Sequence, residues 1–266
     1  MEHLIKKAAR DLVASTYAIA LTGAGISTES GIPDYRGPSG IWTKNPQAEI
    51  KAFSSYQNFL KDPKLWWEDR IKGLNRFRSR GDAKPNSGHY ALVQLEEMEI
   101  LRCVITQNVD TLHEKAGTRN LIEYHGNILK LRCVLCTARV YREKIDLKNL
   151  RMRKQLPPLC PNCGGIMKPD GVAFGEPIPQ EVAQKSLGEI WNSDLMLICG
   201  TSAVVYPFAG LPKRARQRKG TALRIIEINA QPTPLTREGI SDYLIQGKTG
   251  EILPRIVEEV KMLKNI

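Results

Sequence analysis

Residues 17–27 have the sequence YAIALTGAGIS, a short apolar run that ends in a glycine-rich turn. The run Tyr17–Leu21 predicts a buried strand, and the turn after it presents backbone N–H groups that can bind a phosphate. The usual dinucleotide-binding fingerprint has a third Gly or Ala where this chain has Thr28. Taken alone, the turn fits a dinucleotide site and a plain strand–helix connection equally well.

The chain continues with the same alternation of short apolar runs and amphipathic segments. Strands are expected at 17–21, 101–106, 121–124, 195–199, 224–229 and 243–246, and helices at 2–16, 87–97, 109–116, 179–191, 208–218 and 252–263. Short aliphatic strands that alternate with helices predict an α/β fold with a doubly wound parallel sheet.

Two segments interrupt this alternation. Residues 32–86 contain no clear strand and are expected to form a helical insertion over the main sheet. Residues 126–175 contain two close cysteine pairs and are expected to form a metal-stapled module. The main core would then comprise about 1–31, 87–125 and 176–266 of a single catalytic domain spanning residues 1–266.

Composition places the chain among ordinary globular proteins. Of its 266 residues, 42% are hydrophobic and 25% are charged. No run of eighteen apolar residues occurs, and charged residues interrupt the apolar ones near the N-terminus, so neither a membrane span nor a signal peptide is expected. Cys103 and Cys199 lie in apolar runs, as buried thiols do, which fits a reducing compartment. We therefore expect a cytoplasmic protein.

The formal net charge is +11, and the basic residues are unevenly distributed. Residues 126–163 contain nine Lys or Arg and only two acidic residues, and a second basic run lies at 213–219. Basic surfaces favour acidic partners, including nucleic acid. A solvated surface with no partner explains the same charges, so direct nucleic-acid binding stays open.

The cysteine pairs are Cys133/Cys136 and Cys160/Cys163, with the spacing C-x2-C-x23-C-x2-C. Two such pairs supply four thiolates, the closed ligand set of a structural zinc ion. The set leaves no open coordination position, so we expect the zinc to have no catalytic role. The alternative is that the four thiols bind no metal.

Polar residues gather in loops that follow the predicted strands. Asp34, Tyr35 and Arg36 lie in the long loop after the first strand, where they can contact a ribose, an aromatic ring and a diphosphate. A salt bridge within the loop is the alternative. The sequence TQNVD at 106–110 follows the second strand, and His125 follows the third. In a parallel sheet these loops share one edge, where ligands bind.

Taken in order, these motifs resemble those of the sirtuins, the NAD-dependent protein lysine deacylases, in their prokaryotic form. The matching segments are GAGIS and SGIPDYRG within 23–37, TQNVD at 106–110, His125-Gly126, the two cysteine pairs, GVAFGE at 171–176, GTSAVVYP at 200–207 and IEIN at 226–229. They span nearly the whole chain. Each motif is modest, but their shared order is highly specific.

The resemblance implies a Rossmann-like domain with a small zinc-binding module and a helical module. It implies NAD contacts at Gly23, Ala24, Gly25, Ile26, Ser27, Asp34, Tyr35, Arg36, Trp42, Gln107, Asn108, Asp110, His125, Gly200, Thr201, Ser202, Asn229, Lys248 and Thr249. It implies strands that hold the acyl-lysine peptide at Val172, Ala173, Phe174 and Gly175 and at Ala203, Val204 and Val205. The zinc ligands would be Cys133, Cys136, Cys160 and Cys163.

The resemblance also implies a mechanism. Asn108 and Asp110 would hold the nicotinamide carboxamide while the acyl carbonyl oxygen displaces nicotinamide from the ribose. His125 would then act as general base on a ribose hydroxyl, and the products would be free lysine, nicotinamide and O-acyl-ADP-ribose. A histidine that titrates near its usual pKa suits this proton transfer at neutral pH.

Departures from the family pattern bear on the acyl group. Tyr35 replaces the family's usual Phe. The family's acidic-acyl enzymes carry a Tyr-x-x-Arg pair in the helical module, and no Tyr occurs between Tyr56 and Tyr90, although Arg70, Arg76 and Arg78 are present. We therefore expect acetyl and longer apolar acyl groups to be preferred over succinyl.

Three other functions compete with this interpretation. A hydride-transfer dehydrogenase would share the glycine-rich turn, but its fingerprint is broken here. A nucleic-acid-binding zinc protein would use the basic module and leave residues 23–37 and 106–110 unexplained. A mono-ADP-ribosyltransferase would cleave the same glycosidic bond, and only its products distinguish it. Among protein substrates, the basic surface is compatible with nucleic-acid-binding proteins.

Overall fold

The computed structural model describes residues 1–73 and 83–266, and its centre is a parallel sheet of six strands. The sheet has the order β3-β2-β1-β7-β8-β9. Its strands are β1 (Ala18–Thr22), β2 (Leu101–Thr106), β3 (Leu121–Glu123), β7 (Leu195–Cys199), β8 (Arg224–Asn229) and β9 (Tyr243–Gln246). The doubly wound α/β fold predicted from the sequence is confirmed.

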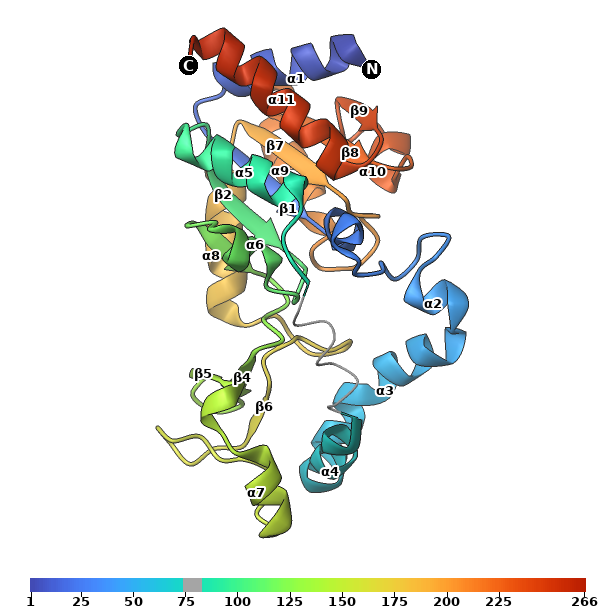
Figure 1. Cartoon of the computed structure of the whole chain (residues 1–266), viewed down its shortest axis with the longest axis vertical. Helices are drawn as coiled ribbons and strands as arrows, with labels where there is room; N and C mark the ends of the chain where they lie inside the picture. The colour runs from blue at the N-terminus through green and yellow to red at the C-terminus, as the bar shows by residue number, and fades with distance from the viewer. Residues whose placement is uncertain (74–82) are drawn as a thin grey trace.

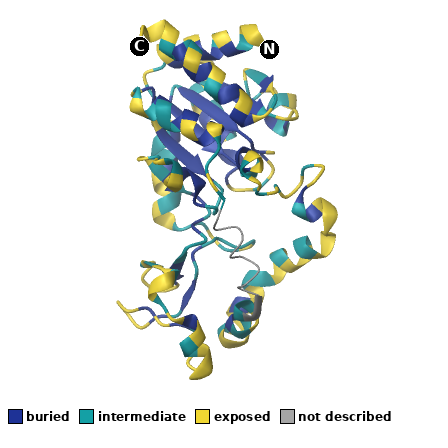
Figure 2. Ribbon diagram, in the orientation of Figure 1, coloured by how far each residue is buried: buried dark blue, intermediate teal, exposed yellow. Residues whose placement is uncertain are grey.

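Helices cover both faces of this sheet (Figure 1). One face packs against α1 (Glu2–Ala14), α5 (Ser87–Glu97) and α11 (Thr249–Lys264), and the other against α8 (Gln180–Asn192) and α9 (Gly210–Lys219). Short helices α6 (Leu112–Ala116) and α10 (Pro234–Arg237) follow β2 and β8. β1 and β7 are buried at every position (Figure 2), and apart from Thr22 their residues are all apolar, as expected for central strands covered on both faces.

The strand order reverses between β1 and β7. Chain segments leave β1 for β2 and β3 on one side, and β7 leads to β8 and β9 on the other. The loops after β1 and β7 therefore diverge at their carboxyl ends, which is the position where open α/β sheets bind ligands. The glycine-rich turn 23–27 begins there and continues as a 3-10 helix, η1 (Ala24–Ser30).

A second, antiparallel sheet lies at the opposite end of the molecule from the two termini (Figure 1). It has the order β5-β4-β6, formed by β4 (Lys130–Cys133), β5 (Arg139–Tyr141) and β6 (Met167–Pro169). A short 3-10 helix, η3 (Arg142–Lys144), and helix α7 (Leu147–Met152) complete this module. These strands were not predicted, because each has three or four residues and carries a charged side chain.

The described part of the insertion after β1 is helical, as expected, with α2 (Ile41–Lys44), α3 (Pro46–Lys61) and α4 (Pro63–Gly73). Its expected position over the main sheet is wrong. Phe59 and Trp67 share a hydrophobic core with Leu131, Leu147 and Met167 of the cysteine-containing module. The buried Trp67 indole N–H donates to the Met167 carbonyl at 2.9 Å, which fixes this packing because a buried indole needs an acceptor.

Candidate active site and cysteine cluster

The glycine-rich turn is clamped against the loop after β7. The Gly25 amide donates to the Gly200 carbonyl at 2.7 Å, and the Gly23 amide donates to the Cys199 carbonyl at 3.1 Å. A Cβ at Gly25 would lie 2.7 Å from the Gly200 oxygen, so only glycine allows this approach. Gly200 itself has φ +60°, in the left-handed region that favours glycine.

Side chains of the loop after β2 reach into the same region. The Gln107 amide donates to the Thr201 hydroxyl at 2.6 Å. Asn108 Nδ2 donates to the Gly23 carbonyl at 3.0 Å and to the Ser27 hydroxyl at 3.1 Å. The loops after β1, β2 and β7 are therefore joined into one polar surface at the carboxyl edge of the sheet.

Asp110 extends this surface. Its carboxylate accepts the Ser27 hydroxyl at 2.7 Å and the Leu112 amide at 3.0 Å. Burial raises the pKa of Asp110, and these two hydrogen bonds oppose that rise. Beneath it, the Thr22 hydroxyl lies 2.8 Å from the Thr106 hydroxyl and 2.9 Å from His113 Nε2, which supports the ends of β1 and β2.

His125 lies two residues after the end of β3, and the loop after β2 orients its ring. Nδ1 lies 3.2 Å from the Gln107 carbonyl. A carbonyl only accepts, so Nδ1 carries the proton and Nε2 has a free lone pair. Tyr124 and Phe208 pack near the ring, with centroids 5.4 and 6.1 Å away.

The titration of His125 differs from the expectation of a pKa near the usual value. Burial lowers its pKa to about 4, and the hydrogen bond to the Gln107 carbonyl opposes this only in part. The imidazole is therefore neutral at pH 7. Sequence alone could not predict this, because the burial of the ring depends on distant segments such as the one that carries Phe208.

The long loop after β1 does not contain the Asp–Arg salt bridge that was the alternative. Asp34 accepts the Gly37 amide at 3.0 Å and so closes a turn. Arg36 stacks over Trp42, 4.4 Å from the ring centroid, and lies 3.6 Å from Glu49. Tyr35 also contacts Trp42, with ring centroids 4.8 Å apart, so this end of the loop is packed on α2.

The remaining predicted cofactor residues lie at the other half of the same edge. Asn229 ends β8, where its Nδ2 donates to the Gln231 carbonyl at 2.7 Å. Lys248 is exposed and pairs with Glu251 at 2.9 Å, whereas Thr249 is buried at the start of α11. Thr201 is buried and Ser202 is exposed after β7. All of these residues therefore follow carboxyl ends of strands.

The two segments expected to hold a peptide are irregular loops. Residues 171–176 and 201–206 belong to no strand. Val172 donates its amide to the His125 carbonyl at 2.8 Å, which ties the first segment to the histidine. Phe174 stacks on Phe53, with centroids 4.3 Å apart, and lies 5.6 Å from Trp42. Ala203 is buried and Val204 is exposed in the second segment.

Two contacts to the glycine-rich turn were missed by the sequence analysis. Asn86 Nδ2, just before α5, donates to the Ile26 carbonyl at 2.8 Å and to the Ser30 hydroxyl at 2.9 Å. Glu29 accepts the Gly250 amide at 2.7 Å, which joins the turn to α11. No local sequence signal marks these pairs, because the partners are far apart along the chain.

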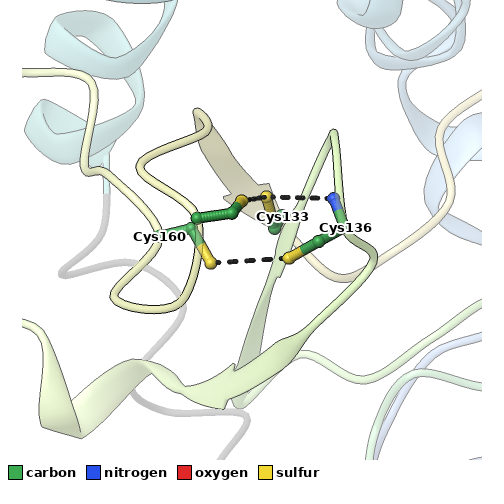
Figure 3. Close-up of side chains that lie close together, drawn as sticks. Cys133, Cys136 and Cys160 are labelled. Carbon is green, nitrogen blue, oxygen red and sulfur yellow. Dashed lines mark hydrogen bonds between the residues drawn. The ribbon is translucent and has the colours of Figure 1, made fainter.

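Four cysteines form a compact cluster in the small antiparallel module (Figure 3). The Sγ atoms of Cys133, Cys136, Cys160 and Cys163 all lie within 4.8 Å of one another. The Cys133–Cys163 and Cys136–Cys160 pairs are 3.5 and 3.7 Å apart. A Zn–S bond of about 2.3 Å in a tetrahedron requires sulfurs about 3.8 Å apart, so the residues fit a structural zinc ion.

The backbone around the cluster favours a thiolate at Cys133. The amides of Leu135 and Cys136 point at Cys133 Sγ, at 3.4 and 3.5 Å. Although burial opposes the change, these N–H groups lower the pKa of Cys133 to about 7. By contrast, burial raises the pKa of Cys199 to about 12, which makes that thiol unreactive.

No helix in the described ranges is long and apolar enough to cross a membrane.

Comparison with known proteins identifies relatives along the whole chain. The model of the Sir2 family matches residues 23–207. An NAD-dependent protein deacylase of Pyrococcus abyssi is 44% identical over 260 residues, which cover 98% of this chain and 99% of the relative. An NAD-dependent protein deacetylase of Saccharolobus solfataricus is 41% identical over 261 residues, with 97% and 98% covered.

Solved structures of Sir2 proteins are similar to this chain over nearly its whole length. A Sir2 homologue in complex with NAD superposes with a TM-score of 0.76 at 39% identity, covering 99% of this chain and 94% of that one. A Sir2 variant with a deacetylated p53 peptide and 3′-O-acetyl-ADP-ribose has a TM-score of 0.77 at 35% identity, with 96% and 98% covered. A Sir2 protein bound to a myristoylated histone peptide has a TM-score of 0.70 at 36% identity, with 100% and 99% covered.

Proposed function

Because the chain belongs to the Sir2 family and is an NAD-dependent protein deacylase, we propose that His125 is the general base of its reaction. The observation that carries this proposal is the hydrogen bond between His125 Nδ1 and the Gln107 carbonyl, which leaves Nε2 free. A neutral imidazole with a fixed tautomer can take a proton at Nε2 without first losing one. The products would be free lysine, nicotinamide and O-acyl-ADP-ribose.

NAD supplies a ribose whose bond to cationic nicotinamide is already easily broken. The chain contributes binding and orientation around that bond. Asn108 and Asp110, joined through the Ser27 hydroxyl, present an amide and a carboxylate that suit a carboxamide. His125 Nε2 would accept the proton of a ribose hydroxyl, which then attacks the acyl carbon.

The same edge of the sheet supplies contacts for the rest of the co-substrate. The turn 23–27 would contact the diphosphate, since it lies at the carboxyl end of β1 beside the strand reversal. Asp34, Tyr35 and Arg36 would cover the nicotinamide half. Gly200, Thr201 and Ser202, with Asn229, Lys248 and Thr249, would contact the phosphates and the adenosine half.

The acyl-lysine peptide would lie between residues 172–175 and 203–205. Neither segment has a strand partner, so an extended peptide between them would supply one by backbone pairing. Two similar structures contain a deacetylated p53 peptide and a myristoylated histone peptide, so relatives bind this class of substrate. The Val172 amide donates a hydrogen bond to the His125 carbonyl. A peptide bound beside Val172 would therefore bring its acyl group close to the proposed base.

We expect apolar acyl groups to be preferred over succinyl. Trp42, Phe53 and Phe174 form an aromatic cluster at the end of the peptide segment. The Arg70 guanidinium carbon lies 4.7 Å from the centroid of the Trp66 ring, and burial lowers the pKa of Arg70. Arg70 therefore packs against Trp66 and is not available to pair with an acidic acyl group. Arg76 and Arg78 lie outside the described residues. A panel of acetyl, myristoyl and succinyl peptides tests this order of preference.

The charge distribution is compatible with nucleic-acid-binding proteins as substrates, because the nucleic acid that they carry would be attracted to a basic surface. Lys144, Lys148, Arg151, Arg153 and Lys154 are exposed and form no ion pair within the described part of the chain. They lie around α7, at the end of the molecule remote from the termini (Figure 1). Turnover that responds neither to added DNA nor to the charge of the substrate would contradict this proposal.

The substitution His125→Ala tests the assignment of the base. We expect deacetylation of an acetyl-lysine peptide to fall by at least about 100-fold, since a general base contributes 10²–10⁴-fold. Zinc content and the circular dichroism spectrum should match the wild type. His3→Ala is the matched control, because His3 is exposed in the first turn of α1. Wild-type turnover by His125→Ala would exclude the assignment.

A further inference from the structure

A cluster of buried charges lies where the small module meets the main domain. It consists of Arg132, Lys168, Asp170 and Glu176, whose side chains are only 9%, 8%, 1% and 9% exposed. Arg132 lies 3.4 Å from Asp170 and 3.6 Å from Glu176, and Lys168 lies 3.1 Å from Glu176. Arg139, which is half-buried, also pairs with Asp170, so the two buried carboxylates face three cations.

These side chains hold the backbone of the segment that leads into residues 172–175. Lys168 Nζ donates to the carbonyls of Pro169 and Gly171, at 2.6 and 3.0 Å. Arg132 donates to the Asp170 carbonyl at 2.8 Å. Glu176 closes the far end, because its carboxylate accepts the Ala173 amide at 2.9 Å. Backbone groups that would otherwise lack partners are thus satisfied by charged side chains.

The same segment is fixed to the loop that carries the candidate base. The Val172 amide donates to the His125 carbonyl, and the Asp170 carboxylate accepts the Asn127 amide, both at 2.8 Å. Gly126 has φ +80°, and a Cβ there would lie 2.7 Å from the Asp170 carbonyl carbon. The cluster therefore sets the distance between residues 172–175 and His125.

Stability alone is a weak reason for such a cluster. The cost of removing four charges from water is rarely recovered by their attraction, and an apolar replacement is often as stable. What the charges add here is a specific geometry for an irregular segment. Because that segment belongs to no strand, no ladder of strand hydrogen bonds supplies this geometry.

We propose that Lys168 and Glu176 are positioning residues that hold residues 172–175 in the conformation that receives the acyl-lysine peptide. The inference rests on the proposed peptide position at these residues. It extends that proposal by assigning the control of peptide affinity to two charged side chains of the buried cluster. NAD binding, which uses the loops after the strands of the main sheet, should be independent of them.

The test compares Lys168→Met, Lys168→Arg and Glu176→Gln with the full-length wild type. We expect Lys168→Met to raise the KM for an acetyl-lysine peptide by about tenfold or more, because small displacements at a binding site have large kinetic effects. The KM for NAD and the zinc content should stay unchanged. Lys168→Arg, which keeps a cationic donor, should recover part of the loss, and Glu176→Gln gives a milder perturbation where Lys168→Met fails to fold.

Two controls make the result specific. Lys185→Met removes an exposed ion pair with Glu181, at 2.7 Å, and should leave both KM values unchanged. Hydrogen exchange of the peptide that covers residues 169–176, measured without substrates, should be faster in Lys168→Met. An unchanged peptide KM in Lys168→Met and Glu176→Gln, or equal changes in the KM for peptide and for NAD, would overturn the inference.

Phe174→Ala distinguishes a failure of this inference from a failure of the proposed peptide position at residues 172–175. If Phe174→Ala raises the peptide KM and the Lys168 and Glu176 variants do not, the cluster has no positioning role and the peptide position stands. If none of the three changes the peptide KM, the peptide binds elsewhere, and the proposed position and the inference both fail.

Discussion

At the scale of single residues, His125 combines two features that a base requires. Its tautomer is set by one carbonyl, and its protonation state is set by burial. The Gln107 carbonyl belongs to the loop after β2, and its hydrogen bond partly opposes the effect of burial on the pKa of His125. The residue is thus neutral and oriented before any substrate arrives.

The low pKa of His125 predicts an unusual pH profile. A base works when it is deprotonated, so kcat/KM should stay high as the pH falls through 6.5 and decline only near about 4. The measurement is kcat/KM for an acetyl-lysine peptide between pH 4.5 and 8, with the fold checked at each pH. An acid limb with its midpoint near 6.5 would show that the imidazole titrates as it does in water.

At the scale of elements, the site depends on the close approach of two loops at the strand reversal. The turn after β1 and the loop after β7 touch through Gly25 and Gly200, with no side chain between them. The two backbones can come this close because neither glycine carries a side chain.

Gly25→Ala should therefore reduce NAD affinity strongly, by about tenfold or more, since the new Cβ would sit 2.7 Å from the Gly200 oxygen and one loop must move. Calorimetric titration with NAD measures this. Gly188→Ala in α8 is the matched control, because no atom lies within 4 Å of the added Cβ. Equal NAD affinity in Gly25→Ala and wild type would mean that the loop contact does not shape the site.

The cysteine-containing module and the helical insertion share one hydrophobic core, so the cysteine cluster supports the packing of both. Trp66 and Trp67 of α4 pack against that core. Removal of zinc by a chelator should therefore change the tryptophan fluorescence, and the change should be lost in a variant that carries Trp66→Phe and Trp67→Phe. The helix content of the main domain should persist. A fluorescence change carried instead by Trp42 or Trp191 would contradict this coupling.

At the scale of the whole molecule, the main sheet was predictable because its strands are aliphatic runs bounded by turn residues. Even the convergence of the site residues follows from the topology, since the carboxyl ends of parallel strands share one edge. The small sheet was not predictable, because segments such as Arg139–Tyr141 alternate too briefly to be distinguished from loop.

Contacts between distant segments were also beyond the sequence. The insertion was expected over the main sheet, but the hydrogen bond from Trp67 to the Met167 carbonyl places its helices on the cysteine module. The sequence also could not show which basic residues of 126–163 form ion pairs. Lys130, Arg132 and Arg139 pair with acids that are buried or partly buried, whereas the basic residues around α7 stay exposed. Charge spacing along the chain does not reveal which cations find partners.

Deacylation is tested directly by mass spectrometry of an acetyl-lysine peptide incubated with the full chain, with and without NAD. We expect the acetyl group to be lost only with NAD, and nicotinamide and O-acetyl-ADP-ribose to appear in equal amounts. Release of nicotinamide with ADP-ribose attached to protein, and no loss of acetyl, would contradict this expectation and indicate an ADP-ribosyltransferase instead.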